Sequence, residues 1–302
     1  MAWRGLHISR AAHLSLDKSR IKVRFLEVEE DGNEPLFFPI EDVAWIILDH
    51  ARSTLSARMI AACMESGVAI VFSDQRHHPC GMALPFHQHF AQPEVARLQI
   101  SVSQPLRKQI WAQIVKAKIA NQAQALNYQQ IPESDVLAKM ANHVRSGDPK
   151  NVEARAARFY WSQLFENFIR SDENDLRNAM LNYGYACARA AIARAVAATG
   201  FIPSLGLHHA GHLNAFNLVD DLIEPFRPIV DRAVVEHLVE RDIEENQLTL
   251  EDRQAMAAVL SRDVVVAGDQ FTLLNATEMA VESLRRAMLQ KNAKLLRFPE
   301  GW

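Results

Sequence analysis

The sequence has 302 residues, enough for two domains, and its 49% hydrophobic and 23% charged residues are typical of an ordinary globular protein. No apolar run is long enough to span a membrane, and Cys63, Cys80 and Cys187 are too widely spaced for a disulfide framework or a zinc ribbon, which favours a reducing cytoplasm. The net charge of −3 by itself weighs against a nucleic-acid-binding protein, although basic residues gather locally.

The first part of the chain, to about residue 90, reads mostly as strands. Residues 20–26 alternate in polarity, whereas 43–48 and 68–72 are rich in β-branched residues, and the uniformly apolar 68–72 is expected to be a central strand. Residues 53–66 switch to a helical period, with Ser53 or Thr54 as a possible cap. These patterns predict a small β-rich domain with one helix over residues 1–92.

From residue 104 onward the apolar residues recur with helical spacing almost throughout. Pro93 and Pro105 bracket the changeover and predict a linker over 93–104, followed by a helical domain over 105–302. A small hairpin is expected within 263–274. Helices are expected at 105–125, 133–145, 151–170, 174–199, 214–224, 228–241, 249–261 and 275–291. The predicted fold class is α+β, with a small N-terminal β domain and a larger all-α C-terminal domain.

One carboxylate stands out near the start of the helix at 151–170, which Asp148 or Asn151 can cap. The apolar stripe of this helix passes through Ala157 and Tyr160, and one turn before Ala157 lies Glu153. Burying an unpaired carboxylate costs several kcal/mol, so Glu153 needs a cation, a metal or a network of donors. The alternative is that Glu153 interacts only with the helix dipole or an arginine.

A second group combines histidines with carboxylates. His208 and His209 lie in a glycine-containing loop just before a short predicted helix. One face of that helix carries polar residues at spacings of three or four, namely Asn214, Asn217, Asp221 and Glu224. Carboxylates beside an imidazole suit a site for Mg²⁺ or Mn²⁺. The alternatives are a solvated helix face and a pair of exposed histidines.

Basic residues gather around the first carboxylate and on the helix before it. One cluster consists of Arg145, Lys150, Arg155 and Arg158, and another runs from Lys108 to Lys118. Such clusters are either solvated helix faces or surfaces for an anion such as the phosphate backbone of DNA. The sequence contains no phosphate-binding loop, dinucleotide fingerprint or nucleophile elbow, which disfavours a nucleotide-driven motor, a dehydrogenase and a serine hydrolase.

Taken together, four segments resemble the CRISPR spacer-acquisition integrase family, the universal DNA endonuclease of CRISPR adaptation, in the form typical of type II systems. The resemblance covers the whole chain and is specific only as a combination. The segments are 148–158 (DPKNVEARAAR), 181–185 (LNYGY), 205–209 (LGLHH) and 214–228 (NAFNLVDDLIEPFRP).

The resemblance implies a site and an architecture. It implies an N-terminal β domain used for dimerisation and an α-helical catalytic domain. It also implies that Glu153, His209 and Glu224 are catalytic and bind Mg²⁺ or Mn²⁺, with His208 and Asp221 as neighbours or alternative ligands. The cluster of Arg145, Lys150, Arg155 and Arg158 would then hold DNA.

The resemblance further implies partners and a reaction. Members of the family form homodimers, and two dimers flank a dimer of a small ferredoxin-like CRISPR-associated partner, giving a heterohexamer. A 3′-hydroxyl of a captured DNA duplex would attack a phosphodiester in the repeat array. Two alternatives stay open: a structure-selective nuclease that uses water as the nucleophile, and a non-catalytic DNA-binding scaffold of the same complex.

Overall fold

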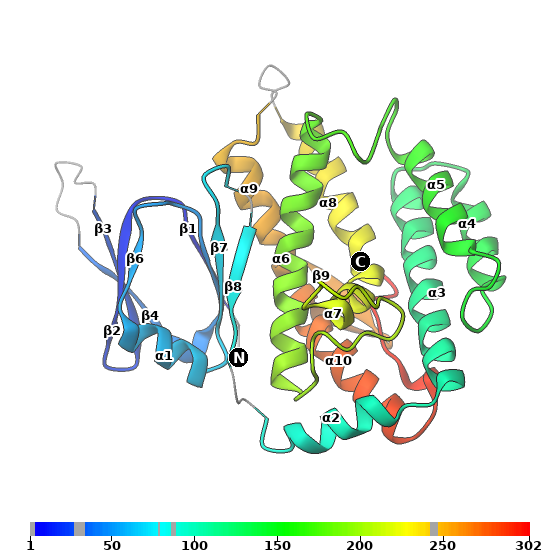
Figure 1. Ribbon diagram of the computed structural model, residues 1–302. Coiled ribbons are helices and arrows are strands. Elements are labelled where there is room, and N and C mark those ends of the chain that lie inside the picture. The colour runs from blue at the N-terminus through cyan, green and yellow to red at the C-terminus, as the bar shows by residue number, and fades with distance from the viewer. Residues whose placement is uncertain (1–3, 27–33, 78, 86–88, 242–246) are drawn as a thin grey trace. The chain divides into compact units, whose positions relative to one another are not determined.

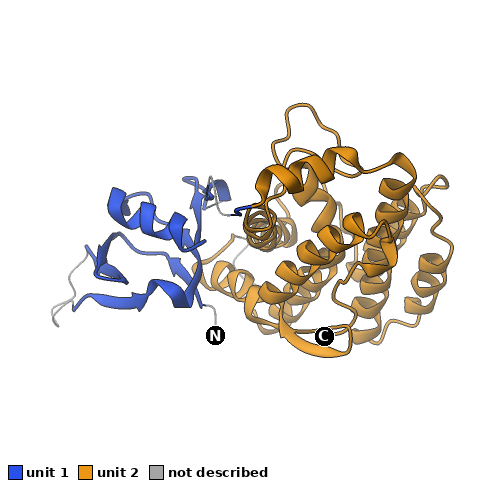
Figure 2. Ribbon diagram, turned by 90° about the horizontal axis from the view of Figure 1, so that it is seen from below, with its two compact units in different colours: residues 1–90 blue, residues 91–302 orange. Residues whose placement is uncertain are grey.

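The computed structural model describes residues 4–26, 34–77, 79–85, 89–241 and 247–302. The chain divides into two compact units, 1–90 and 91–302, which Figure 2 shows in different colours. The first unit is mostly strands and the second mostly helices, so the predicted α+β class is confirmed (Figure 1). No helix among the described residues is both long and apolar enough to cross a membrane.

The N-terminal unit contains two four-stranded sheets. The first has the order β1 (Arg4–Ile8), β5 (Val43–Leu48), β7 (Ala69–Ser73), β8 (Pro79–Ala83), with β1, β5 and β7 parallel. The second has the order β4 (Leu36–Pro39), β3 (Arg20–Phe25), β2 (Ala12–Asp17), β6 (Thr54–Leu55). All six residues of β5 are buried, and the apolar run at 68–72 forms β7 in the interior of its sheet, as predicted.

One hydrophobic cluster joins both sheets to α1 (Ala57–Glu65), the α-helix among the described residues of this unit. Leu6 and Ile46 of the first sheet, Leu14 and Ile21 of the second, and Met59 of the helix belong to it. The helix begins later than predicted. Thr54 pairs with β2 in strand β6, and Ser56 caps the helix by accepting a hydrogen bond from the backbone N–H of Met59.

The C-terminal unit begins with a helix where a linker was predicted. Residues 93–104 lie largely within α2 (Gln92–Ser101), and α3 (Gln104–Tyr128) follows almost at once. Pro93 and Pro105 each lie in the first turn of a helix, where the missing N–H of proline is not needed. The two prolines therefore start helices here instead of separating two domains.

The remaining elements follow the predicted order with shifted ends. They are α4 (Ser134–Asn142), α5 (Val152–Leu164), α6 (Leu176–Ala198), α7 (Asn217–Leu222), the 3₁₀ turn η2 (Glu224–Phe226), α8 (Arg227–Glu240), α9 (Leu250–Ala257), β9 (Asp263–Val266), β10 (Asp269–Thr272) and α10 (Leu273–Leu289). The antiparallel β9–β10 pair confirms the predicted hairpin, so the unit is not all-α. Its turn places Ala267 and Gly268 at positive φ, as short hairpins require.

Two long helices position the polar residues of this unit. The helix α3 packs against α4, α5, α8 and the turn η2, while α6 packs against α7, α8, α9 and α10 (Figure 1). Alanines are frequent on α6, and nearly all of its side chains from Met180 to Val196 are buried. Because α5 and η2 both lie against α3, residues distant in the sequence come together along one face of that helix.

Candidate active site

Asp221 holds the histidine loop together. Its carboxylate is fully buried and accepts hydrogen bonds from the backbone N–H groups of Leu207 (2.5 Å), His208 (3.2 Å) and His209 (3.0 Å). It also accepts a bond from Nδ1 of the His209 ring, at 2.8 Å. With both oxygens used in this way, Asp221 orients the loop and the imidazole.

The polar face predicted for residues 214–224 serves the same loop. The amide nitrogen of Asn217 donates to the carbonyls of Ser204 and Gly211, and its oxygen accepts the backbone N–H of Gly211. At Gly206 a Cβ atom would lie only 2.2 Å from the carbonyl oxygen of His209, so the loop can close this tightly only around a glycine. The face is therefore a structural support and is not solvated.

The two histidines differ in their surroundings. His208 stacks on Trp111 of α3, with ring centroids 4.1 Å apart and planes within 4° of each other. His209 is 43% exposed in its side chain. The hydrogen bond that the His209 ring donates to Asp221 raises the pKa of His209 above its ordinary value. Burial opposes this shift, and the negative charge of Glu224 adds to it. Because Nδ1 donates to Asp221, Nε2 is the nitrogen left to bind a metal.

Glu153 lies in the first turn of α5, as predicted. Asp148 accepts hydrogen bonds from the backbone N–H groups of Val152 (3.0 Å) and Glu153 (2.9 Å), so Asp148 is the predicted cap that forms, and the side chain of Asn151 makes no capping bond. The side chain of Glu153 is 24% exposed, and its Oε1 lies 2.7 Å from Nζ of Lys118 in α3.

Glu224, at the start of η2, meets the same ammonium group. Lys118 forms a second ion pair with Oε2 of Glu224, while Nε of Arg227 lies 2.9 Å from Oε1. Burial alone would raise the pKa of Glu224, but the positive charges of Lys118 and Arg227 outweigh it and lower the pKa to about 2. Burial likewise opposes the charged form of Lys118, yet the two glutamates raise its pKa overall. Glu224 and Lys118 are therefore both charged at neutral pH.

The two glutamates and the histidine are residue types that bind divalent cations, but the ammonium of Lys118 occupies the space between the glutamates. Glu153 and Glu224 converge on one positive charge, and carboxylate oxygens with an imidazole nitrogen are ligands that Mg²⁺ and Mn²⁺ accept. Across the described part of the chain, no group of three or more His, Cys, Asp or Glu side chains is arranged to hold a metal ion. The ammonium of Lys118 lies between the two carboxylates.

A buried network continues from the cluster into the helical core. Arg227 lies over the ring of Tyr185, 4.6 Å from its centroid. The hydroxyls of Tyr185 and Tyr160 both donate to Asp231 of α8, the latter at 2.9 Å. Burial raises the pKa of Asp231 to about 7, although these hydrogen bonds and the charges of Arg227 and Arg170 favour the ionised form.

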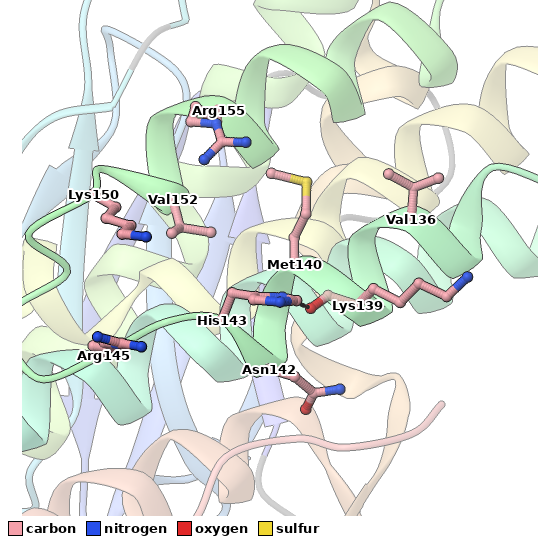
Figure 3. A pocket seen from close by; sticks show the side chains of 9 residues that line it. All are labelled: Val136, Lys139, Met140, Asn142, His143, Arg145, Lys150, Val152 and Arg155. Atoms are coloured by element: carbon pink, nitrogen blue, oxygen red, sulfur yellow. Dashed lines mark hydrogen bonds between the residues drawn. The ribbon is translucent and has the colours of Figure 1, made fainter.

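Three of the four basic residues predicted to hold DNA line one pocket of about 460 Å³ beside α4 and the start of α5. Figure 3 shows the side chains that line it, which are Val136, Lys139, Met140, Asn142, His143, Arg145, Lys150, Val152 and Arg155. Arg158 does not line this pocket and is exposed one turn further along α5. None of the basic residues in the lining forms an ion pair with an acidic side chain of the described chain. The pocket therefore suits an anion.

The sequence did not single out Lys118 as a member of this cluster. The sequence predicts a basic surface from Lys108 to Lys118, whereas the side chain of Lys118 is only 12% exposed and pairs with two acids. A signal was present, because Trp111, Val115 and Gln122 are buried at spacings of four, three and four residues around Lys118. A lysine on the buried stripe of a helix needs acidic partners.

Comparison with known proteins identifies the family of the chain. The family model "CRISPR associated protein Cas1" matches residues 7–265. The chain is 39% identical over 305 residues to a CRISPR-associated endonuclease Cas1 of Neisseria meningitidis serogroup C (strain 8013), covering 99% of this chain and 97% of that protein.

Two solved structures share the fold. A casposase bound to integration product has a TM-score of 0.77 at 20% identity, covering 97% of this chain and 92% of the other. A Cas1 protein from Thermotoga maritima has a TM-score of 0.74 at 18% identity, covering 95% and 97%. Since the family model and the relative from Neisseria both span most of the sequence, the chain belongs to the Cas1 family of CRISPR-associated proteins.

Proposed function

We propose that this protein is a metal-dependent DNA endonuclease and strand-transfer integrase of CRISPR adaptation. The observation that carries the proposal is the convergence of Glu153 and Glu224, from two separate elements, on one cation. The name of the Neisseria relative and the integration product in the casposase structure support phosphodiester chemistry. In the proposed reaction, a 3′-hydroxyl of captured DNA attacks a phosphodiester of the repeat array.

Three side chains would bind the metal, and a fourth would orient one of them. Glu153, Glu224 and Nε2 of His209 would hold Mg²⁺ or Mn²⁺, and Asp221 would fix the imidazole through Nδ1. A bound ion of this kind polarises a phosphoryl oxygen and stabilises the charge that develops on it. His209 has an alternative role, because its raised pKa suits it to protonate the leaving oxygen.

DNA would be held by the unpaired basic side chains. Arg145, Lys150 and Arg155 would bind backbone phosphates in the pocket of Figure 3, and the exposed Arg158 on α5 would add a further contact. On the histidine loop, a second cavity of about 420 Å³ is lined by Arg107, His209 and His212 and carries no acidic side chain. Contacts to phosphates of this kind are sequence-tolerant and weaken as salt is added.

The proposal extends to the assembly. The family resemblance supports a homodimer formed through the N-terminal unit, with residues 1–92 acting as the dimerisation domain. It also supports a heterohexamer with a small ferredoxin-like CRISPR-associated partner, acting in the cytoplasm on spacer DNA and the repeat array.

A strand-transfer assay tests the proposal. A labelled duplex with free 3′-hydroxyls is incubated with a repeat-containing DNA, the protein, its partner and Mg²⁺ or Mn²⁺. A joined product is expected with the unchanged protein and is expected to disappear in Glu153→Gln or in excess chelator, while fluorescence anisotropy shows duplex binding retained. Glu166→Gln, which removes an exposed carboxylate just beyond the same helix, is the matched control and should keep activity.

The three open possibilities give different products. Cleavage without joining would show that water is the nucleophile and that the protein is a nuclease. Assembly on DNA that resists chelation and yields no product would indicate a scaffold. Full activity of Glu153→Gln would refute the proposed site.

A further inference from the structure

Lys118 lies between the carboxylates of Glu153 and Glu224. Its Nζ contacts Oε1 of Glu153 and Oε2 of Glu224, which come from α5 and η2, while Lys118 itself comes from α3. Arg227 contacts the other oxygen of Glu224. Three elements of the helical unit therefore meet at this ammonium group.

The charges of this cluster are already balanced. Two carboxylates, from Glu153 and Glu224, face two cations, from Lys118 and Arg227. A divalent ion that bound the same two carboxylates would lie within a few ångströms of the ammonium of Lys118, where repulsion between like charges in a partly buried site is strong. Lys118 and the divalent ion are thus competitors for the same two oxygens.

We propose that Lys118 is an internal counter-ion that keeps Glu153 and Glu224 together before the metal binds, and that the divalent ion displaces its ammonium from both carboxylates. The inference rests on the proposed function, since it assumes that these two glutamates bind the metal. It gives Lys118 a positioning role: the lysine prevents two neighbouring like charges from separating, and it lowers the affinity of the site for the metal.

Mn²⁺ binding to the metal-free, full-length protein tests the competition directly. Free Mn²⁺ is measured by electron paramagnetic resonance during titration of the unchanged protein, Lys118→Met and the control Lys116→Met. Lys116 lies on the same helix and has no acidic partner among the described residues. Lys118→Met should bind Mn²⁺ about tenfold more tightly or better, equivalent to about 1.4 kcal/mol, whereas Lys116→Met should match the unchanged protein.

A second measurement uses the unchanged protein and does not depend on the variant folding. Lys118 is modified by reductive methylation with and without saturating Mg²⁺, and the extent at each lysine is read by mass spectrometry. In the metal-free protein Lys118 should react slowly, because both of its partners bind it in a partly buried site. Saturating Mg²⁺ should raise its modification severalfold while the modification of Lys116 stays constant.

The outcomes separate this inference from the proposed function. If Glu153→Gln and the unchanged protein bind Mn²⁺ equally weakly, the proposed metal site is wrong. If binding depends on Glu153 but Lys118→Met binds no more tightly than the unchanged protein, the competition is refuted and the metal site stands. Modification of Lys118 that does not change with Mg²⁺ refutes the displacement.

Discussion

The substitution Asp231→Asn should remove a large part of the pH dependence of stability. Asp231 is 1% exposed, and its two carboxylate oxygens accept hydrogen bonds from Tyr160 and Tyr185. Burial raises its pKa from 3.8 to about 7, against the opposing charges of Arg227 and Arg170. An asparagine has the same shape as the protonated acid and can satisfy both tyrosines, but it does not ionise.

The sign and the magnitude follow from the pKa. Because the folded-state pKa of this acid lies above its unfolded value, the folded protein binds more protons between the two values, and stability falls as pH rises. Each pH unit within that interval is worth about 1.4 kcal/mol. From pH 5 to pH 8 the contribution of Asp231 to the free energy of unfolding should therefore fall by roughly 2 to 3 kcal/mol.

Equilibrium unfolding in urea, measured at pH 5, 6, 7 and 8 for both proteins, gives the comparison. Every other ionisable group is shared, so the difference between the two pH profiles isolates Asp231. The unchanged protein should lose roughly 2 to 3 kcal/mol more than Asp231→Asn over this range. Parallel profiles would mean that Asp231 is ionised in the folded protein throughout, and the argument from burial would be wrong.

Three further predictions concern the loop and the pocket. Asp221→Ala leaves three backbone N–H groups and the ring of His209 without their acceptor, so it should lower the free energy of unfolding by about 3 kcal/mol or more in denaturant titrations. Gly206→Ala brings a Cβ against the carbonyl of His209 and should lower stability by about 1–3 kcal/mol, measured in the same way. Lys150→Gln with Arg155→Gln should reduce the slope of log K against log salt by about 1 to 2 in anisotropy titrations with duplex DNA.

Each of these has a result that would contradict it. Gly81→Ala is the control for the glycine, because nothing lies within 4 Å of its Cβ position, and equal stability losses at the two glycines would remove the steric argument. Unchanged hydrogen exchange at the amides of 207–209 in Asp221→Ala would show that the loop does not depend on this carboxylate. An unchanged salt slope would show that the pocket does not contact phosphates.

Local patterns predicted much of the fold. The alternation and β-branching before residue 90, the uniformly apolar β7 and the hairpin of β9 and β10 all have the predicted type, since each depends on neighbours in the sequence. The division of the chain at residues 90 and 91 lies close to the predicted end of the first domain, whereas the linker predicted from the prolines is replaced by α2. Pro93 and Pro105 are compatible with a linker and with the first turn of a helix, and only the packing of α2 and α3 decides between the two.

The sequence pointed to the two acids of the candidate site, Glu153 and Glu224, but not to Lys118, the cation that lies between them. Glu153 stands out because its helix has an apolar stripe, and the structure brings it to the same partner as Glu224; their binding of a metal stays a prediction. The pairing with Lys118 joins three elements that are far apart in sequence, and no local pattern encodes which of several nearby lysines faces inward. The spacing of Asp221 on its helix likewise did not reveal that its carboxylate accepts hydrogen bonds from the backbone of the histidine loop.

The first turn of α5 contacts both the basic pocket and Lys118. Val152 borders the basic pocket and the next residue, Glu153, contacts the ammonium of Lys118, while Asp148 holds both of their amides. Adjacent Cα atoms are about 3.8 Å apart across a rigid peptide plane, so a single peptide unit joins the wall of the basic pocket to the residue that contacts Lys118. A molecule that binds against Val152 therefore lies one residue along the backbone from the carboxylate of Glu153.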